Sequence, residues 1–218
     1  MLDNIEKLRK IAKLSFKSKE GVDTENKTSL FNIIDGENTE IDAFYHSDAA
    51  ALLYGLLEEE DVPEVKKRID SCSYDVANEL FIVLAGTLKE EGQDYYLEKL
   101  HDESFTMKYV VLHAIHKFGD ERFMKPCLDY LHLQMNSRPT MEEVRAFIQG
   151  RSTKKIKDQQ EYLRNLSDIL AIIEYLKRVD NTEYHQALEF LLNNADRLEA
   201  RERRYLRDEH GLEFDDYQ

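Results

Sequence analysis

The chain has 218 residues, with 44 acidic and 30 basic side chains, a formal net charge of −14 and 42% hydrophobic residues. This apolar share is sufficient for a continuous core and excludes an intrinsically disordered chain. The negative charge disfavours binding to DNA or RNA, because phosphate backbones are bound through clustered Lys and Arg.

The expected location is the cytoplasm, with no membrane segment. The amino-terminal segment has the basic residues of a signal peptide, but they interrupt every apolar run and no small-residue cleavage site follows. No stretch approaches the roughly 18 apolar residues that span a bilayer. Cys72 and Cys127 lie far apart and lack CxxC spacing, so we expect buried thiols and neither a zinc knuckle nor a redox pair.

Residues 1–42 are predicted to form one amphipathic helix followed by a loop. Apolar residues from Ile5 to Leu14 recur at three- and four-residue spacing, which is typical of a helix. Residues 15–42 are rich in Gly, Ser, Thr and Asn, which favours a loop. The short apolar run at residues 30–34 is interpreted as part of that loop or as a short element, and the sequence leaves open whether it is a strand.

Residues 43–135 are predicted to form three helical hairpins. Pairs of apolar residues recur at an interval of about 31 residues, and a second apolar cluster follows each pair. The first-helix pairs are Leu53/Leu57, Leu84/Leu88 and Ala114/Phe118, and the second-helix clusters are Val65/Ile69, Leu97/Leu100 and Leu128/Leu131. Phe44 is assigned to the first apolar stripe. The run Leu80–Ala85 is apolar on all sides and predicts a central core helix.

Residues 136–157 interrupt this pattern. Thr140-x-x-Glu143 is a capping box that predicts a short helix around Val144, Phe147 and Ile148, and a polar link follows. Residues 158–207 are then predicted to form a helical hairpin, with the apolar pairs Ile172/Leu176 and Leu188/Leu191, and a charge-rich helix. Residues 208–218 form an acidic tail.

The predicted fold is all-α, a short interrupted stack of antiparallel helical hairpins. The spacing over residues 43–194 resembles that of the HEAT and armadillo families, which implies an α-solenoid with an extended surface. The repeats are shorter than the roughly 40 residues of HEAT units, so an irregular helical bundle is the alternative. Stacked hairpins favour binding of a macromolecule over chemistry in a deep pocket.

The sequence predicts no enzyme, no cofactor and no metal site. It contains no glycine-rich phosphate loop and no GxSxG motif. His113 and His116 lie three residues apart on one predicted helix and His132 lies on the next, but HExxH spacing is absent and a core histidine bonded to a backbone carbonyl is the ordinary explanation. The many carboxylates lie on polar faces, where they lack the desolvation that acid–base catalysis requires.

The charge distribution favours a protein partner. From Thr28 to Val65 the sequence has ten acidic residues and no Lys or Arg. The run Glu58, Glu59, Glu60 and Asp61 is therefore a candidate docking surface for a basic protein, with a solvated hairpin end as the alternative.

A basic segment follows much later in the chain. It has no acidic neighbour in sequence and comprises Arg145, Arg151, Lys154, Lys155 and Lys157. We expect these cations to pair with the acidic hairpins of the same chain, and contact with an anionic partner is the alternative.

Tyrosines recur on the predicted second helices. Tyr95, Tyr130 and Tyr184 occupy equivalent places in successive hairpins, where exposed rings would line one binding face. The alternative is that these rings pack between hairpins. The binding face would combine Asp94, Tyr95, Glu98, Asp129 and His132.

The leading hypothesis is a non-catalytic acidic scaffold that binds a basic protein. Its size and acidity resemble those of bacterial immunity and inhibitor proteins, which implies neutralisation of a toxin by covering a basic surface. The alternative is an enzyme or a ligand-binding domain with a pocket beside residues 136–157. A homo-oligomer in which acidic and basic segments pair between copies is a third hypothesis.

Overall fold

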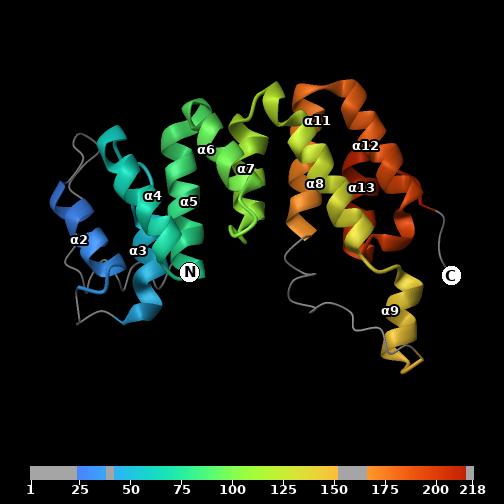
Figure 1. Ribbon diagram of the computed structural model, residues 1–218, viewed down its shortest axis with the longest axis horizontal. Coiled ribbons are helices and arrows are strands. Elements are labelled where there is room, and N and C mark those ends of the chain that lie inside the picture. The colour runs from blue at the N-terminus through green and yellow to red at the C-terminus, as the bar shows by residue number, and fades with distance from the viewer. Residues whose placement is uncertain (1–23, 38–41, 152–165, 215–218) are drawn as a thin grey trace. The chain divides into compact units, whose positions relative to one another are not determined.

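The computed structural model describes residues 24–37, 42–151 and 166–214 (Figure 1). It is all-α, since the described residues form α-helices and short 3-10 turns and contain no strand. The chain divides into two compact units, residues 1–92 and 93–218. This boundary falls inside the segment that the sequence predicts as three hairpins. The predicted helix at residues 5–14 lies outside the described residues.

The described helices of unit 1 pack around α5. Helix α2 packs against α3, and both α3 and α4 pack against α5. The bounds are α2 Thr24–Ile34, η1 Ala43–Tyr45, α3 His46–Leu52, η2 Glu59–Asp61, α4 Val62–Ser71, α5 Tyr74–Leu88 and η3 Lys89–Gly92. Leu80, Phe81 and Leu84 of α5 are buried, so α5 is the central helix that its apolar run predicts.

Residues 30–34 form the end of helix α2, and their assignment to a loop is wrong. Leu30, Ile33 and Ile34 recur at helical spacing and all three are buried. Their apolar face is covered because α2 packs against α3. Burial of this face therefore outweighs the Ser, Thr and Asn content of the segment.

Helix α3 is shorter than the apolar stripe in its sequence. It ends at Leu52, and Gly55 turns the chain with a φ of 77°, which favours glycine. Leu53 and Leu57 are buried as predicted, although they lie beyond the helix end. Phe44 is exposed, so its assignment to the apolar stripe is wrong.

Unit 2 is organised around α7 and α11. Helix α7 packs against α6 and α11, and α11 also packs against α8 and α12. The bounds are α6 Gln93–His101, α7 Lys108–Phe118, η4 Glu121–Phe123, α8 Met124–Ser137, α9 Met141–Ile148, α11 Leu166–Val179, α12 Asn181–Asn193, η5 Ala195–Arg197 and α13 Ala200–His210. Ile115, Ile172 and Leu176 are buried where α7 and α11 meet.

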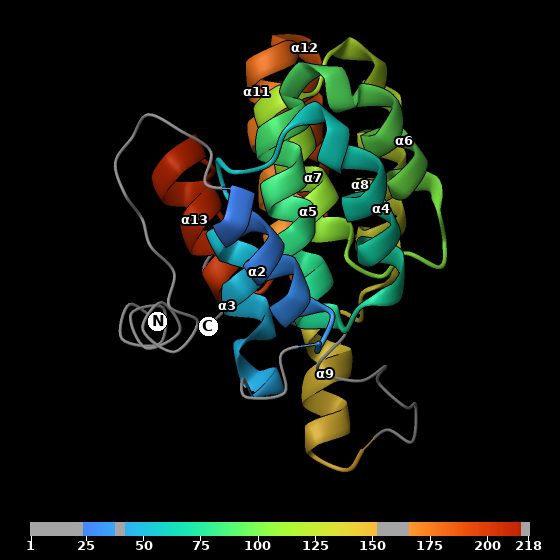
Figure 2. The same ribbon diagram turned by 90° about the vertical axis from the view of Figure 1, so that its left-hand side faces the viewer.

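Two local predictions in unit 2 are confirmed. The capping box of Thr140 and Glu143 opens α9, and the charge-rich segment forms α13. Helix α9 stands apart from α11 and α12 in both views (Figure 1, Figure 2). The part of the last predicted hairpin at residues 158–165 lies outside the described residues.

Candidate protein-binding surface

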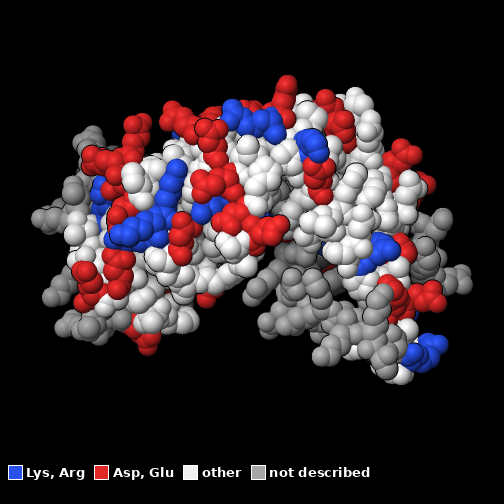
Figure 3. Space-filling model, in the orientation of Figure 1, with Lys and Arg blue, Asp and Glu red and all other residues white. Residues whose placement is uncertain are grey.

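Unit 1 carries −9 of the net charge of −14, since residues 1–92 contain twenty acidic and eleven basic side chains. Residues 24–92 contain sixteen acidic and five basic side chains. Figure 3 shows acidic side chains spread over the visible face of this unit around a strip of basic ones. A carboxylate is available to a partner only if no cation of the same chain already binds it.

Lys27 neutralises part of the predicted acidic run. It is buried, and its Nζ donates to Glu58 at 3.1 Å and to Asp61 at 2.8 Å. The hydrogen bond to Asp61 raises the pKa of Lys27, although burial opposes that rise. Glu58 and Asp61 therefore have a structural role, because they hold α2 to the start of α4. Glu59 and Glu60 are exposed and form no ion pair with a described residue.

Arg68 of α4 is also occupied within the unit. Its Nε and Nη2 donate to the two oxygens of Asp35 at 2.9 and 2.7 Å, and Nη1 lies 3.0 Å from Glu64. This fork-shaped pairing fixes α4 to the turn after α2. Since Lys27 and Arg68 are engaged in this way, they are not available to pair with Glu59 or Glu60.

A row of surface residues runs along α5. Asp75, Glu79, Ile82 and Gly86 follow one another at spacings of four, three and four residues, which places them on one face of the helix. Ile82 is 43% exposed even though it lies inside the apolar run of the central helix. This face therefore presents a large apolar side chain to solvent.

The ring of Tyr54 covers Gly86 at one end of this row. A Cβ atom at Gly86 would lie 2.8 Å from Tyr54 Cε2, so the ring fits there because residue 86 has no side chain. Tyr54 is 67% exposed. An accessible aromatic ring is thus held against α5, one helical turn from Ile82.

Three carboxylates gather at the other end of the row. Burial raises the pKa of Glu79, and the charges of Asp48 on α3 and Asp75 add to this rise, while a hydrogen bond from Asn78 at 3.2 Å opposes it. Interacting like charges on one surface favour the arrival of a cation. We name this surface the α5 strip, and it comprises Asp48, Tyr54, Asp75, Glu79, Ile82 and Gly86.

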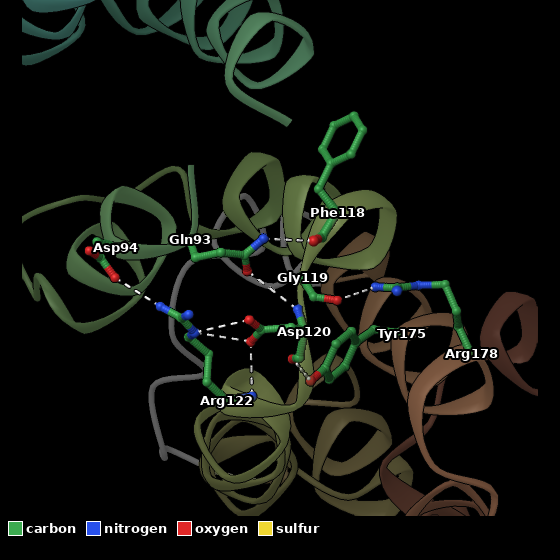
Figure 4. Close-up of polar contacts among 8 residues, drawn as sticks. All are labelled: Gln93, Asp94, Phe118, Gly119, Asp120, Arg122, Tyr175 and Arg178. Atoms are coloured by element: carbon green, nitrogen blue, oxygen red, sulfur yellow. Dashed lines mark hydrogen bonds and ion pairs between the residues drawn. The ribbon is translucent and has the colours of Figure 1, made fainter. Parts of the chain in front are cut away.

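In unit 2, the predicted site residue Asp94 lies in the first turn of α6, and its side chain reaches the turn between α7 and α8 (Figure 4). Arg122 donates from Nη1 to Asp94 at 2.8 Å and from Nε to Asp120 at 3.0 Å. The neighbouring Gln93 is buried, and its amide donates to Phe118 O at 2.7 Å and accepts from Asp120 N at 3.3 Å. Asp94 is therefore exposed but already paired.

Helix α11 fixes the same turn from its other side (Figure 4). Tyr175 Oη donates to Asp120 O at 2.7 Å. Arg178 donates to three carbonyls at the end of α7, those of Ile115 at 3.0 Å, His116 at 2.9 Å and Gly119 at 2.6 Å. Ile115 O also accepts from Gly119 N at 2.8 Å, whereas most carbonyls in the last turn of a helix lack a backbone donor, so Arg178 caps α7.

The other predicted site residues of unit 2 are spread over α6 and α8. Glu98 is exposed on α6. Asp129 of α8 pairs with Lys125 at 2.6 Å, and the His132 ring packs against Phe190 of α12 with 4.3 Å between the ring centroids. These contacts explain Asp129 and His132 as surface and packing residues of α8.

The prediction of an exposed tyrosine row is wrong. Tyr95 is only 6% exposed, and Tyr184 is also buried. Tyr130 lies partly buried and donates its hydroxyl to Asp168 at 2.8 Å. The rings fill spaces between helices, as in the packing alternative, and the hydroxyls of Tyr130 and Tyr184 lie within hydrogen-bond distance of Asp168 and His210.

A cavity of about 390 Å³ lies beside α13. It is lined by Leu170, Arg201, Glu202, Arg204, Tyr205, Asp208 and Glu209. Glu202 is fully buried, but both of its carboxylate oxygens accept from Arg138 Nη1 at 2.8 Å. The lining thus offers charges of both signs and no carboxyl that is both buried and unpaired, and the ligand-binding alternative stays a prediction.

Comparison with known proteins adds no family. No protein-family model, curated protein or solved structure matches this chain. The resemblance to HEAT and armadillo proteins therefore stays a prediction. Within the described ranges, no cluster of three or more His, Cys, Asp or Glu side chains is arranged to hold a metal ion. Nor does any helix there combine the length and apolarity needed to cross a bilayer.

Sequence reasoning missed Tyr54, Ile82 and Gly86. The spacing of Asp75, Glu79 and Gly86 within an apolar helix is a signal that one face of α5 is open. No local pattern indicates that Tyr54 reaches Gly86, because that contact depends on how α3 packs against α5.

Proposed function

We propose that this chain is a non-catalytic helical module that binds a basic protein partner through the acidic surface of unit 1. In its most concrete form, it is an inhibitor of the immunity type that neutralises a toxin by covering a cationic surface. The observation that carries this proposal is the α5 strip, where an exposed aromatic ring and Ile82 lie next to three crowded carboxylates.

The physical support is that two cations of unit 1 already bind carboxylates of the same unit. Lys27 and Arg68 are bound to internal carboxylates, so they do not neutralise Glu59, Glu60 or the α5 strip. An excess of like charge destabilises a folded unit, and a basic partner removes that repulsion. Exposed carboxylates also accelerate encounter with such a partner, while an aromatic anchor supplies contact area.

The test is affinity purification of the tagged chain together with the product of a neighbouring gene. We expect a complex whose association rate constant falls roughly tenfold when the ionic strength is raised from about 50 to about 300 mM. Stopped-flow or surface plasmon resonance measurements at both salt concentrations provide this number. Rapid binding with no salt dependence would contradict the electrostatic mechanism.

Charge-matched variants locate the surface. The triple variant Glu59→Gln, Glu60→Gln, Asp75→Asn removes exposed carboxylates from unit 1 and should slow association roughly tenfold at low salt. The control variant Glu142→Gln, Glu189→Gln, Glu209→Gln removes as many exposed carboxylates from unit 2. Equal slowing by both variants would show that net charge matters and that unit 1 is not the binding surface.

A further inference from the structure

Helix α9 carries an apolar face that is left uncovered within the described structure. Val144, Phe147 and Ile148 lie on one side of this eight-residue helix, and none of its residues is buried. Phe147 is 43% exposed and Ile148 is 72% exposed. Two large neighbouring apolar side chains on a surface helix are typical of an interaction site.

An isolated helix of this length is unstable in water. The capping box secures its start, since Glu143 N donates to Thr140 Oγ1 at 3.2 Å and Thr140 N donates to Glu143 Oε2 at 2.9 Å. Helix α9 also packs against the short turn η5. The second half of α9, which bears Phe147 and Ile148, would gain most from being covered.

The charge around this apolar face is basic. Arg145 and Arg151 are exposed and form no ion pair with a described residue. The sequence continues with Lys154, Lys155 and Lys157, which lie outside the described residues. The acidic Glu143 is occupied by the capping box, and Glu142 lies at the opposite end of α9 from Ile148.

The α5 strip has the complementary pattern. Its apolar end is formed by Tyr54 and Ile82, and its acidic end by Asp75 and Glu79 with Asp48 beside them. From Asp75 to Gly86 the strip extends roughly 16 Å along the helix, which is enough for the eight residues of α9 at about 1.5 Å each. The basic side chains of α9 therefore complement the carboxylates of the α5 strip, and both surfaces present apolar side chains.

We infer that α9 of one copy of this chain docks on the α5 strip of a second copy. Phe147 and Ile148 pack on the apolar end of the strip, and the arginines lie beside its carboxylates. This is recognition of an amphipathic helix by a helical surface. An extended segment would gain less there, because the described residues offer no strand edge for main-chain hydrogen bonds.

This contact is heterologous, because two different patches meet. A dimer closes if each copy docks its α9 on the other, and otherwise the contacts propagate into a chain. Self-association would also occupy the surface that we propose for the basic partner, so the two events compete. Only this competition rests on the proposed function.

Sedimentation velocity of the full chain tests the inference. We expect the weight-average sedimentation coefficient to rise between about 5 and about 200 μM protein at about 50 mM salt, as expected for a contact of micromolar affinity. At about 300 mM salt the dissociation constant should be roughly tenfold higher. A monomer throughout this range at low salt overturns the inference.

Variants on the two surfaces assign the contact. The α9 variant Phe147→Ser, Ile148→Ser and the strip variant Tyr54→Ser, Ile82→Ser should each raise the dissociation constant at least tenfold. The control Leu133→Ser changes a side chain on α8 that is 65% exposed, and it should leave self-association unchanged. Circular dichroism verifies that each variant keeps its helical content.

Mixing the two variants separates this arrangement from other dimers. An equimolar mixture retains one intact α9–strip contact, so it should self-associate more strongly than either variant alone. Absence of this rescue, or loss of association in the α9 variant but not in the strip variant, overturns the inference. The proposed function is read separately, because the α9 variant keeps its strip intact and should bind the basic partner at least as tightly as the original chain.

Discussion

The ring of Tyr54 takes the space above Gly86 that a side chain at position 86 would fill. The contact joins the turn after α3 to the last turn of α5, and it leaves most of the ring accessible. Residue 86 therefore positions an aromatic side chain that is available to a partner.

Substitution of Gly86 by Ala should weaken binding without lowering stability. Alanine is more favourable than glycine within a helix by about 0.5–1 kcal/mol, and the exposed Tyr54 ring can rotate away from the new methyl group. We expect an unchanged or higher free energy of unfolding together with a 3- to 10-fold loss of self-association, as an order-of-magnitude estimate for a displaced anchor. Urea unfolding and sedimentation velocity measure the two effects.

The contrast is Gly119→Ala. A Cβ atom there would lie 2.6 Å from the backbone oxygen of Ile115, which cannot rotate away, so this variant should lose stability. If Gly86→Ala also lost stability, the ring of Tyr54 would not rotate away from the new methyl group.

Asp168 should destabilise the fold at neutral pH. Its Oδ2 accepts from Tyr130, its Oδ1 has no hydrogen-bond partner among the described residues, and burial raises its pKa to about 6. Between about pH 4 and pH 6 the folded state holds the proton more tightly than the unfolded state, so stability falls as the pH rises through this window. Asp168→Asn should therefore raise the free energy of unfolding at about pH 7.5 by about 1–2 kcal/mol.

Urea unfolding at about pH 4.5 and pH 7.5 measures this effect, with the exposed Asp129→Asn as control. The Asn variant should gain nothing at the lower pH, where the native carboxyl is largely protonated when folded. If Asp168→Asn were less stable than the original chain at the higher pH, Arg138 would stabilise the ionised Asp168 carboxylate more than burial opposes its ionisation.

The buried pair of Arg138 and Glu202 should be costly to break from one side. Arg138 Nη1 donates to both oxygens of Glu202 at 2.8 Å, and both side chains are buried. Glu202→Gln leaves the guanidinium without its counter-charge and should cost about 3 kcal/mol. The double variant Arg138→Met, Glu202→Leu should cost less than the sum of the two single changes, because it removes both charges of the pair. If the cost of the double variant equalled the sum of the costs of the single variants, Arg138 and Glu202 would not interact energetically.

His210 should make α13 sensitive to acid. Its Nδ1 lies 2.8 Å from Tyr184 Oη and its Nε2 lies 3.1 Å from Glu174 Oε1. Burial lowers the pKa of His210, although Glu174 opposes this. The unfolded state therefore takes up the proton first, and stability falls as the pH drops below about 6.5.

His210→Gln should reduce this acid-induced loss of stability. The pH dependence is opposite to that of Asp168, whose contribution to stability falls as the pH rises. Hydrogen exchange of the α13 amides at about pH 7 and pH 5.5 measures it, with His132→Gln as control. Equal acceleration of exchange in the original and His210→Gln chains would assign the acid sensitivity to another group.

The sequence was sufficient where the relevant interactions are local. The capping box of Thr140 and Glu143 spans three residues, and it located the start of α9 correctly. The same holds for the all-α fold, which follows from helical spacing along almost the whole described chain.

Sequence reasoning failed where a side chain's environment depends on distant helices. Phe44 belongs to an apolar stripe and is exposed, whereas Tyr95 lies on a polar helix and is buried. Lys27 lies 31 and 34 residues from Glu58 and Asp61, so no spacing rule relates the cation to the acidic run. The face of a helix that meets its neighbour is decided by packing, and the candidate surface depends on that choice.

The Arg178 cap has a consequence for the order in which the chain is made. The carbonyls that it binds at the end of α7 precede it by 59 to 63 residues. A growing polypeptide completes α7 long before the ribosome has added Arg178, and until then the carbonyls of His116 and Gly119 lack this donor. Unit 1 has all of its residues by Gly92, whereas unit 2 can close only when most of its own sequence has emerged.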